Sequence, residues 1–168
     1  MMFPQHTLES APTGSRPLMK DTVEHLGHLP DAVARLAESP EMLGGFLQAS
    51  ALFEGSTLDP LAREVVVMVI AARNGCRVCL AMHTGRLRAL NADAALITAL
   101  RTGKPPADER LAALWTFTMR VLETAGEVPD EELKDFLSAG FTTRNALEVV
   151  LGIGTYTMST LANRMVRA

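Results

Sequence analysis

Proline and glycine residues divide this sequence into segments of helical length. Four prolines lie near expected helix starts, and four glycines lie near expected helix ends. These residues are Pro30, Pro40, Pro60 and Pro129, and Gly75, Gly103, Gly126 and Gly140. The expected helices cover 18–27, 30–38, 40–54, 59–74, 76–90, 93–102, 107–125, 130–139 and 143–166. No alternating apolar and polar pattern favours strands, so the sequence predicts an all-α fold.

The length is that of a single domain. A chain of 168 residues is long enough to bury about two-thirds of its unfolded surface. Residues 1–17 contain three prolines and a glycine without a periodic apolar pattern, so we expect an extended arm that is ordered only if it docks. No linker or repeat interrupts the remainder, and 18–168 is therefore expected to form one all-helical domain.

The segment 59–74 is expected to be the most enclosed helix. After its first turn it is apolar on nearly every side, which is typical of a helix surrounded by other helices or by a subunit interface. Asp59 before Pro60 marks its start, and Asp130 before two glutamates marks the start of 130–139. Such an enclosed helix would suit the centre of an oligomer.

Composition excludes several classes of partner. Sixteen lysines and arginines against nineteen acidic residues give a net charge of −3, so nucleic acid is not an expected partner. The longest aliphatic run, 65–72, is far shorter than the ~20 residues that cross a membrane. Two cysteines are too few for the framework of a small secreted domain, and the first residues lack the pattern of a signal peptide. We therefore expect a cytoplasmic protein.

The sharpest chemical signal is a pair of cysteines followed by a histidine. Cys76, Cys79 and His83 lie at about 0°, −60° and −20° around a helix that turns about 100° per residue, so they share one face. His83 can take the thiol proton of Cys79, and Cys76 is near enough to close a disulfide with it. Cys76 would lie in the first turn after Gly75, where free N–H groups stabilise a thiolate. These residues predict a reactive dithiol.

Such a dithiol can reduce a peroxide. A thiolate that attacks a peroxide oxygen becomes a sulfenic acid, and a second thiol can condense with it. We assign the attack to Cys79, because His83 can supply the proton that the leaving oxygen needs, and the condensation to Cys76. If the helices on either side of Gly75 pack antiparallel, Glu64 could face His83, which predicts a relay from Glu64 through His83 to Cys79.

Other interpretations of these residues remain open. The two cysteines could simply be buried, or they could bind zinc together with His83 and a fourth ligand. The remaining histidines, His6, His25 and His28, have no diagnostic spacing, and we expect no metal. Covalent haem is excluded because Leu80, not histidine, follows Cys79. Glu64 could instead pair with an arginine such as Arg63, Arg73 or Arg86.

The pattern resembles a known family. Asn74, Cys76, Cys79 and His83 are similar to the N-x-C-x-x-C-x-x-x-H signature of the carboxymuconolactone decarboxylase-like superfamily, specifically of its alkylhydroperoxidase AhpD-like, peroxidase-related branch. Glu64, twelve residues before the first cysteine, stands at that family's glutamate position. Flanking segments are similar too, and the resemblance extends from about residue 3 to residue 163.

The resemblance implies a fold, an activity and an assembly. It implies an AhpD-like helical bundle that forms a homo-oligomer, commonly a trimer or a hexamer built from dimers. It implies reduction of hydroperoxides, with Cys79 peroxidatic, Cys76 resolving, and Glu64 and His83 in the proton relay. The reductant would be an external dithiol donor protein rather than a bound cofactor. Decarboxylation is not implied, because the decarboxylase branch of the superfamily generally lacks the cysteine pair.

The sequence departs from the family pattern at two places. Val78 stands where many relatives have an aromatic residue or a histidine, and Thr160 and Leu161 replace the first pair of the N-Y-x-N pattern, of which Asn163 remains. Two other functions fit the cysteine pair: a disulfide oxidoreductase that acts on a protein partner, and a non-enzymatic helical oligomer that serves as a scaffold or redox sensor.

Overall fold

The protein folds into α-helices joined by turns and loops. The structure is a computed structural model that describes residues 2–168, and within them it contains no β-strand. The helices are α1 (Ser15–Leu26), α2 (Asp31–Leu36), α3 (Pro40–Glu54), α4 (Pro60–Arg73), α5 (Arg77–Ala89), α6 (Ala94–Arg101), α7 (Glu109–Glu123), α8 (Asp130–Ser138) and α9 (Thr143–Met165). The predicted all-α class is confirmed.

The first helix begins earlier than expected. α1 starts at Ser15 rather than at residue 18, because Pro17 lies in its first turn, where a missing N–H leaves no helical hydrogen bond unmade. Of the predicted arm 1–17, residue 1 lies outside the described residues and 15–17 are helical. The residues before Ser15 pack against the rest of the chain. Ala11 is 2% exposed, and His6 Nε2 lies 2.7 Å from Glu38 Oε2.

Local capping explains the helix starts. The side chain of Asp59 accepts a hydrogen bond from the backbone N–H of Ala62 at 2.9 Å, as expected for the residue before Pro60. Asp130 differs, because Pro129 occupies the cap position and Asp130 is the first residue of α8. Its carboxylate therefore favours the helix through its charge near the N-terminus rather than by capping.

The α4–α5 turn is the part of the fold that builds the site. Gly75 has φ of +64°, a conformation that side chains disfavour, and it reverses the chain directly after Asn74. The N–H of Cys76 then donates to the carbonyl of Ala71 at 3.0 Å. α5 consequently runs back along α4, which is the condition under which the sequence allowed Glu64 to face His83.

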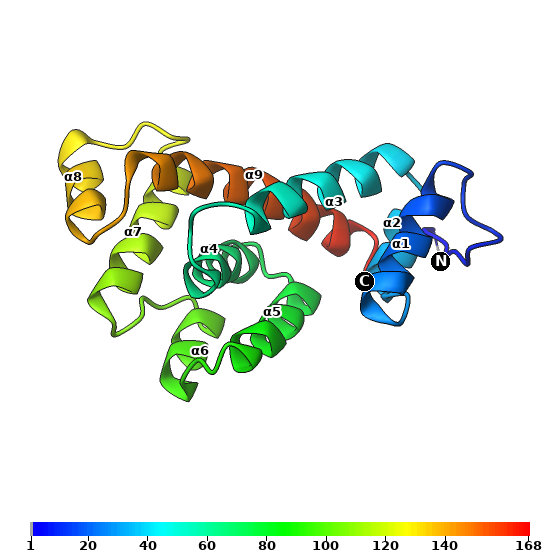
Figure 1. Cartoon of the computed structure of the whole chain (residues 1–168), viewed down its shortest axis with the longest axis horizontal. Coiled ribbons are helices and arrows are strands. Elements are labelled where there is room, and N and C mark those ends of the chain that lie inside the picture. Colours follow the sequence, from blue (N-terminus) through cyan, green and yellow to red (C-terminus); the bar gives the residue numbers. More distant parts are fainter. Residues whose placement is uncertain (1) are drawn as a thin grey trace.

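α4 lies at the centre of the fold. Figure 1 shows α4 nearly end-on, with α5, α6, α7 and the pair α3 and α9 around it. Every residue from 65 to 71 is at most 3% exposed. The chain's own helices thus enclose this segment, and no subunit interface is needed to explain its apolar character.

No helix in residues 2–168 combines the length and the apolar character that crossing a membrane requires.

Candidate active site

The two cysteines lie at the start of α5 and form a disulfide. Cys76 is the N-cap residue of α5, one position before the first turn in which the sequence placed it, because its backbone is still extended after Gly75. Its Sγ accepts the backbone N–H of Cys79 at 3.4 Å, and the two Cα atoms are 5.3 Å apart. The predicted proximity of the two sulfurs is confirmed.

His83 and Glu64 form a buried pair across the two central helices. His83 Nδ1 lies 2.7 Å from Glu64 Oε2, and the two residues are 2% and 6% exposed. An ionised carboxylate only accepts hydrogen bonds, so Nδ1 donates and Nε2 is left to exchange a proton. The predicted contact between Glu64 and His83 is therefore confirmed.

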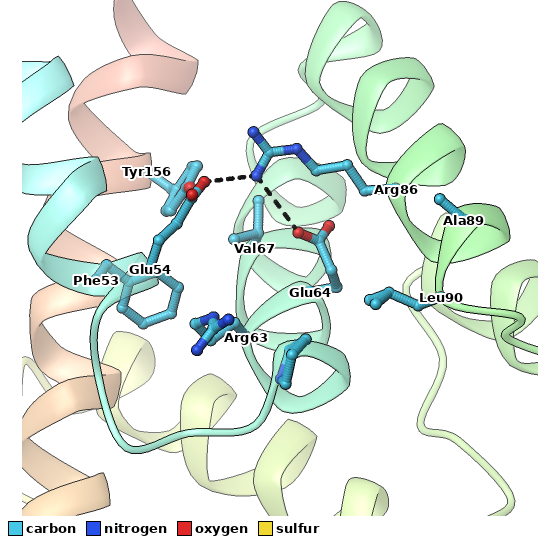
Figure 2. A pocket seen from close by; sticks show the side chains of 10 residues that line it. Phe53, Glu54, Arg63, Glu64, Val67, Arg86, Ala89, Leu90 and Tyr156 are labelled. Atoms are coloured by element: carbon cyan, nitrogen blue, oxygen red, sulfur yellow. Dashed lines mark hydrogen bonds and ion pairs between the residues drawn. The ribbon is translucent and has the colours of Figure 1, made fainter. Parts of the chain in front are cut away.

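Arg86 joins this pair to α3. Its Nη1 atom lies 2.7 Å from Glu54 Oε1 and 3.7 Å from Glu64 Oε1 (Figure 2). Burial alone would lower the pKa of Arg86, but the hydrogen bond to Glu54 and the charges of both glutamates raise it above its ordinary value. Arg86 is the partner for Glu64 among the three arginines that the sequence suggested, whereas Arg63 donates to the carbonyl of Leu58.

Tyr156 was not singled out from the sequence. Its ring meets the ring of His83 edge-on at 5.5 Å, and its hydroxyl lies 3.3 Å from Ser50 Oγ. Burial raises the pKa of Tyr156, because the surroundings disfavour the phenolate. It is the sole tyrosine of the sequence, a signal that could have drawn attention to it.

Asn163 connects α9 to the sulfur of Cys79. Its Nδ2 group donates to Cys79 Sγ at 3.5 Å, and the residue is 4% exposed. One turn earlier, Thr160 accepts a hydrogen bond from Asn74 Nδ2 at 2.8 Å. The threonine that departs from the family pattern thus ties the α4–α5 turn to α9. Val78, the other departure, packs beside the two cysteines.

Two hollows border this group of residues. One, of about 250 Å³, adjoins Glu64 and Arg86, with Phe53, Val67 and Leu90 as apolar walls (Figure 2). The other, of about 340 Å³, adjoins Cys76 at the junction of the α4–α5 turn with the end of α9. The site can therefore be approached from the carboxylate side and from the sulfur side.

The positions of the candidate zinc ligands can be compared with those that a zinc site requires. In the disulfide both sulfurs are occupied, and within residues 2–168 no three His, Cys, Asp or Glu side chains are grouped as metal ligands would be. His6, one of the considered fourth ligands, is bound to Glu38. The arrangement thus holds two sulfurs, an imidazole and a carboxylate that suit thiol and proton chemistry.

Comparison with known proteins agrees with this fold. Residues 37–108 match the carboxymuconolactone decarboxylase family. An uncharacterized peroxidase-related protein from Ralstonia eutropha JMP134, described as an alkylhydroperoxidase AhpD core, superimposes with a TM-score of 0.85 at 20% identity, covering 97% of this chain and 88% of its own. An uncharacterized peroxidase-related protein from Silicibacter sp. TM1040 gives 0.82 at 22% identity, with 99% and 88% covered.

A more distant structure shares most of the fold. A protein of unknown function from Agrobacterium tumefaciens superimposes with a TM-score of 0.67 at 18% identity and covers 77% of this chain and 90% of its own. No curated protein matches the chain significantly by sequence. The family match covers the segment that holds Glu64, Cys76, Cys79 and His83, and the helical fold of the AhpD core is shared over nearly the whole chain.

Proposed function

We propose that the protein is a thiol-dependent hydroperoxide reductase. The observation that carries the proposal is a Cys76–Cys79 disulfide at the start of the helix whose buried His83 is bonded to Glu64. A disulfide between two residues at the N-terminal end of one helix can open and close with little movement of the fold. The AhpD-like fold supports a peroxidase-related redox role for such a pair.

The reaction begins with the reduced pair. His83 Nε2 takes the proton of the Cys79 thiol, the resulting thiolate attacks one oxygen of a hydroperoxide, and the O–O bond breaks. Cys79 becomes a sulfenic acid, and the other oxygen leaves as an alcohol or water with a proton from His83. Glu64 accepts the Nδ1 proton of His83 in a hydrogen bond and so holds the ring with Nε2 free for this transfer.

The second step closes the pair again. The Cys76 thiol attacks the sulfenic sulfur, water leaves, and the disulfide forms. An external dithiol then reduces the disulfide by two thiol exchanges, so that the protein itself needs no bound cofactor. A reducing compartment such as the cytoplasm would supply this dithiol.

Two contacts support Cys79 as the attacking sulfur. The amide N–H of Asn163 points at Cys79 Sγ, and a hydrogen bond to sulfur stabilises its charged form. His83 follows Cys79 by one helical turn, which places the base on the same face. Cys76, at the cap position, is left to resolve.

We also propose that the protein is a homo-oligomer. Leucines, valine and methionine form an exposed stripe along one face of α9: Leu147 is 73% exposed, Val150 48%, Leu161 53% and Met165 67%. Exposed apolar side chains that share one face of a helix are typical of an interface. This supports the assembly that the family resemblance implies, and its test is given in the Discussion.

Peroxide turnover with a dithiol donor tests the enzymatic proposal. We expect the wild-type protein to consume hydroperoxide in proportion to dithiol, and Cys79→Ser to abolish turnover. Without the dithiol, Cys76→Ser should form one sulfenic acid per chain and stop, which a dimedone adduct on Cys79 reveals by mass spectrometry. Met82→Leu is the control, because Met82 is exposed on the same helix and could consume peroxide by its own oxidation.

The outcome also separates the competing functions. If Cys79→Ser turns over as fast as the wild type, the peroxidase proposal is wrong. Reduction of protein disulfides without peroxide turnover would indicate a disulfide oxidoreductase. Stoichiometric oxidation that changes the assembly without any turnover would indicate a redox sensor.

A further inference from the structure

The hollow beside Cys76 has its own chemical character. It lies where the α4–α5 turn meets the end of α9, and Arg77, Arg164 and Arg167 are among the residues that line it. Arg164 Nη1 donates to the carbonyl of Asn74 at 2.6 Å, which fixes this arginine to the turn. The basic residues therefore come from both of the elements that meet at the disulfide.

Positive charge exceeds negative charge in this hollow. All three arginines are exposed, and none of the ion pairs in residues 2–168 includes any of them. Ala168, the last residue of the sequence, also lines the hollow, and even a carboxylate there leaves the positive charges in excess. Because the chain as a whole has a net charge of −3, this cationic surface is a local feature and not a property of the protein at large.

The two sulfurs differ in their relation to the hollow. Cys76 lines it, whereas Cys79 does not. Cys79 Sγ instead receives the amide of Asn163, and Cys79 packs with Ala71 and Leu80. A nucleophile that enters from this side therefore reaches Cys76 before Cys79, which makes Cys79 the leaving sulfur.

Asn163 offers a second feature that points to a ligand. It lines the hollow, it is 4% exposed, and its Oδ1 atom has no hydrogen-bond partner within residues 2–168. A buried amide oxygen without a partner is costly, since it has lost its water. A thiol group of an entering molecule could donate to it.

We propose that the hollow admits the reductant of the disulfide and selects a small dithiol that carries a carboxylate. The inference rests on the proposed redox role of the cysteine pair. One thiolate of the reductant attacks Cys76 Sγ, a mixed disulfide forms, the Cys76–Cys79 bond breaks, and Cys79 leaves as a thiolate beside the Asn163 amide. The second thiol of the reductant loses its proton and attacks its own mixed-disulfide sulfur, which oxidises the reductant to a disulfide and releases reduced Cys76.

A matched pair of reductants tests this selectivity. Dihydrolipoate and dihydrolipoamide have the same two thiols and differ in one distant group, which is a carboxylate in the first and a neutral amide in the second. Oxidised protein is mixed with each under anaerobic conditions without peroxide, and free thiols are counted by maleimide labelling and mass spectrometry. At low salt we expect the second-order rate constant to be at least about threefold larger for dihydrolipoate. The ratio should approach one at about 1 M salt, where the Debye length is about 3 Å.

Charge-removing variants assign the effect to the hollow. Arg77→Gln combined with Arg167→Gln should remove most of the preference for dihydrolipoate and leave the rate with dihydrolipoamide within about twofold, because only steering of the anion is lost. Arg88→Gln is the control, since Arg88 is exposed on the same α5 helix, outside the hollow. It removes one positive charge from the same helix outside the hollow and should retain the preference.

Three results would overturn the inference: equal rates for the two dithiols with the wild type, an unchanged preference in the double variant, or an equal loss in Arg88→Gln. Because disulfide reduction is measured without peroxide, the result is independent of turnover. A charge-selective reduction in a protein that does not consume peroxide would retain this inference and reject the proposed function.

Discussion

Glu64 is a carboxylate in the interior, and its neighbours explain why it is tolerated there. A buried charge needs partners, because it has lost its hydration. Glu64 has two, His83 at 2.7 Å and Arg86 at 3.7 Å, and Arg86 is in turn held by Glu54. One carboxylate thus orients the imidazole, and the other keeps the arginine in place.

Replacing Glu64 should reduce catalysis more than folding. In Glu64→Gln the side chain keeps its shape but loses the charge that stabilises a protonated His83. We expect kcat/KM for hydroperoxide to fall by about 100-fold, the lower range for a positioned acid–base group. Circular dichroism should remain that of a helical protein, since Arg86 retains Glu54.

Glu54→Gln is the matched control for this prediction. It removes the other carboxylate of Arg86 and leaves the His83–Glu64 hydrogen bond in place. We expect its kcat/KM to stay within about fivefold of the wild type, because exposed ion pairs contribute little. Equal losses of kcat/KM in both variants would mean that the carboxylates act by holding Arg86 and not by orienting the imidazole of His83.

The longest helix, α9, brings together residues that are far apart in the sequence. One face carries Tyr156 and Asn163 to His83 and Cys79, and the opposite face is exposed and apolar. The approach of α9 to α3 and α4 depends on Gly152. A Cβ atom there would lie 2.6 Å from Phe53 Cε2 and 3.1 Å from Val66 Cγ1, closer than packed carbon atoms allow.

Gly152→Ala should therefore destabilise the fold despite the higher helix propensity of alanine. We expect the free energy of unfolding to fall by about 1–3 kcal/mol, because Phe53 and the helices must move apart. Gly45→Ala in α3 is the control: nothing lies within 4 Å of a Cβ there, and the residue is exposed. It should gain up to about 1 kcal/mol. Denaturant unfolding measures both, and a Gly152→Ala protein as stable as the wild type would contradict the close approach.

The protein as a unit has a well-enclosed centre and an apolar outer face. α4 is surrounded within one chain, so its burial requires no second copy. The stripe of Leu147, Val150, Leu161 and Met165 on α9 has no such cover in the single chain. Association of copies through this stripe would remove it from water.

A charge in the stripe should disrupt this association. We expect the wild-type protein to have a mass in solution above the 18.1 kDa of one chain, and Leu161→Glu to shift it toward that value. Light scattering after size-exclusion chromatography measures the mass. Leu26→Glu is the control, since Leu26 is 49% exposed at the end of α1 and is not part of the stripe. A monomeric wild type, or an unchanged mass in Leu161→Glu, would reject the proposed interface.

Much of the fold was predictable because its signals are local. Proline at the first position, aspartate caps and glycines after helix ends act on the nearest turn of backbone, and most predicted helices agree with the structure within about two residues, the usual uncertainty of such boundaries. The contact of Glu64 with His83 was also predictable, because a short turn at Gly75 leaves the two helices few arrangements. The errors at Ser15 and Cys76 are shifts at helix starts, where a proline and an extended residue allow more than one boundary.

The rest of the site could not be predicted. Asn163 is 84 residues from Cys79, and Glu54 is 32 residues from Arg86. Contacts at such separations depend on how α3 and α9 cross the central helix, and no neighbouring residue in the sequence specifies that crossing. Tyr156 belongs to the same group, since its place against His83 depends on the close approach at Gly152.

The linear order of residues was sufficient to specify the helices, the adjacent cysteines and the imidazole one turn further on, since each depends on interactions within a few residues. The packing of distant helices established which cysteine borders the arginine-lined hollow and which one receives the Asn163 amide. Exposure and charge around a side chain are produced by every element packed against it, and they exist only once the chain has folded.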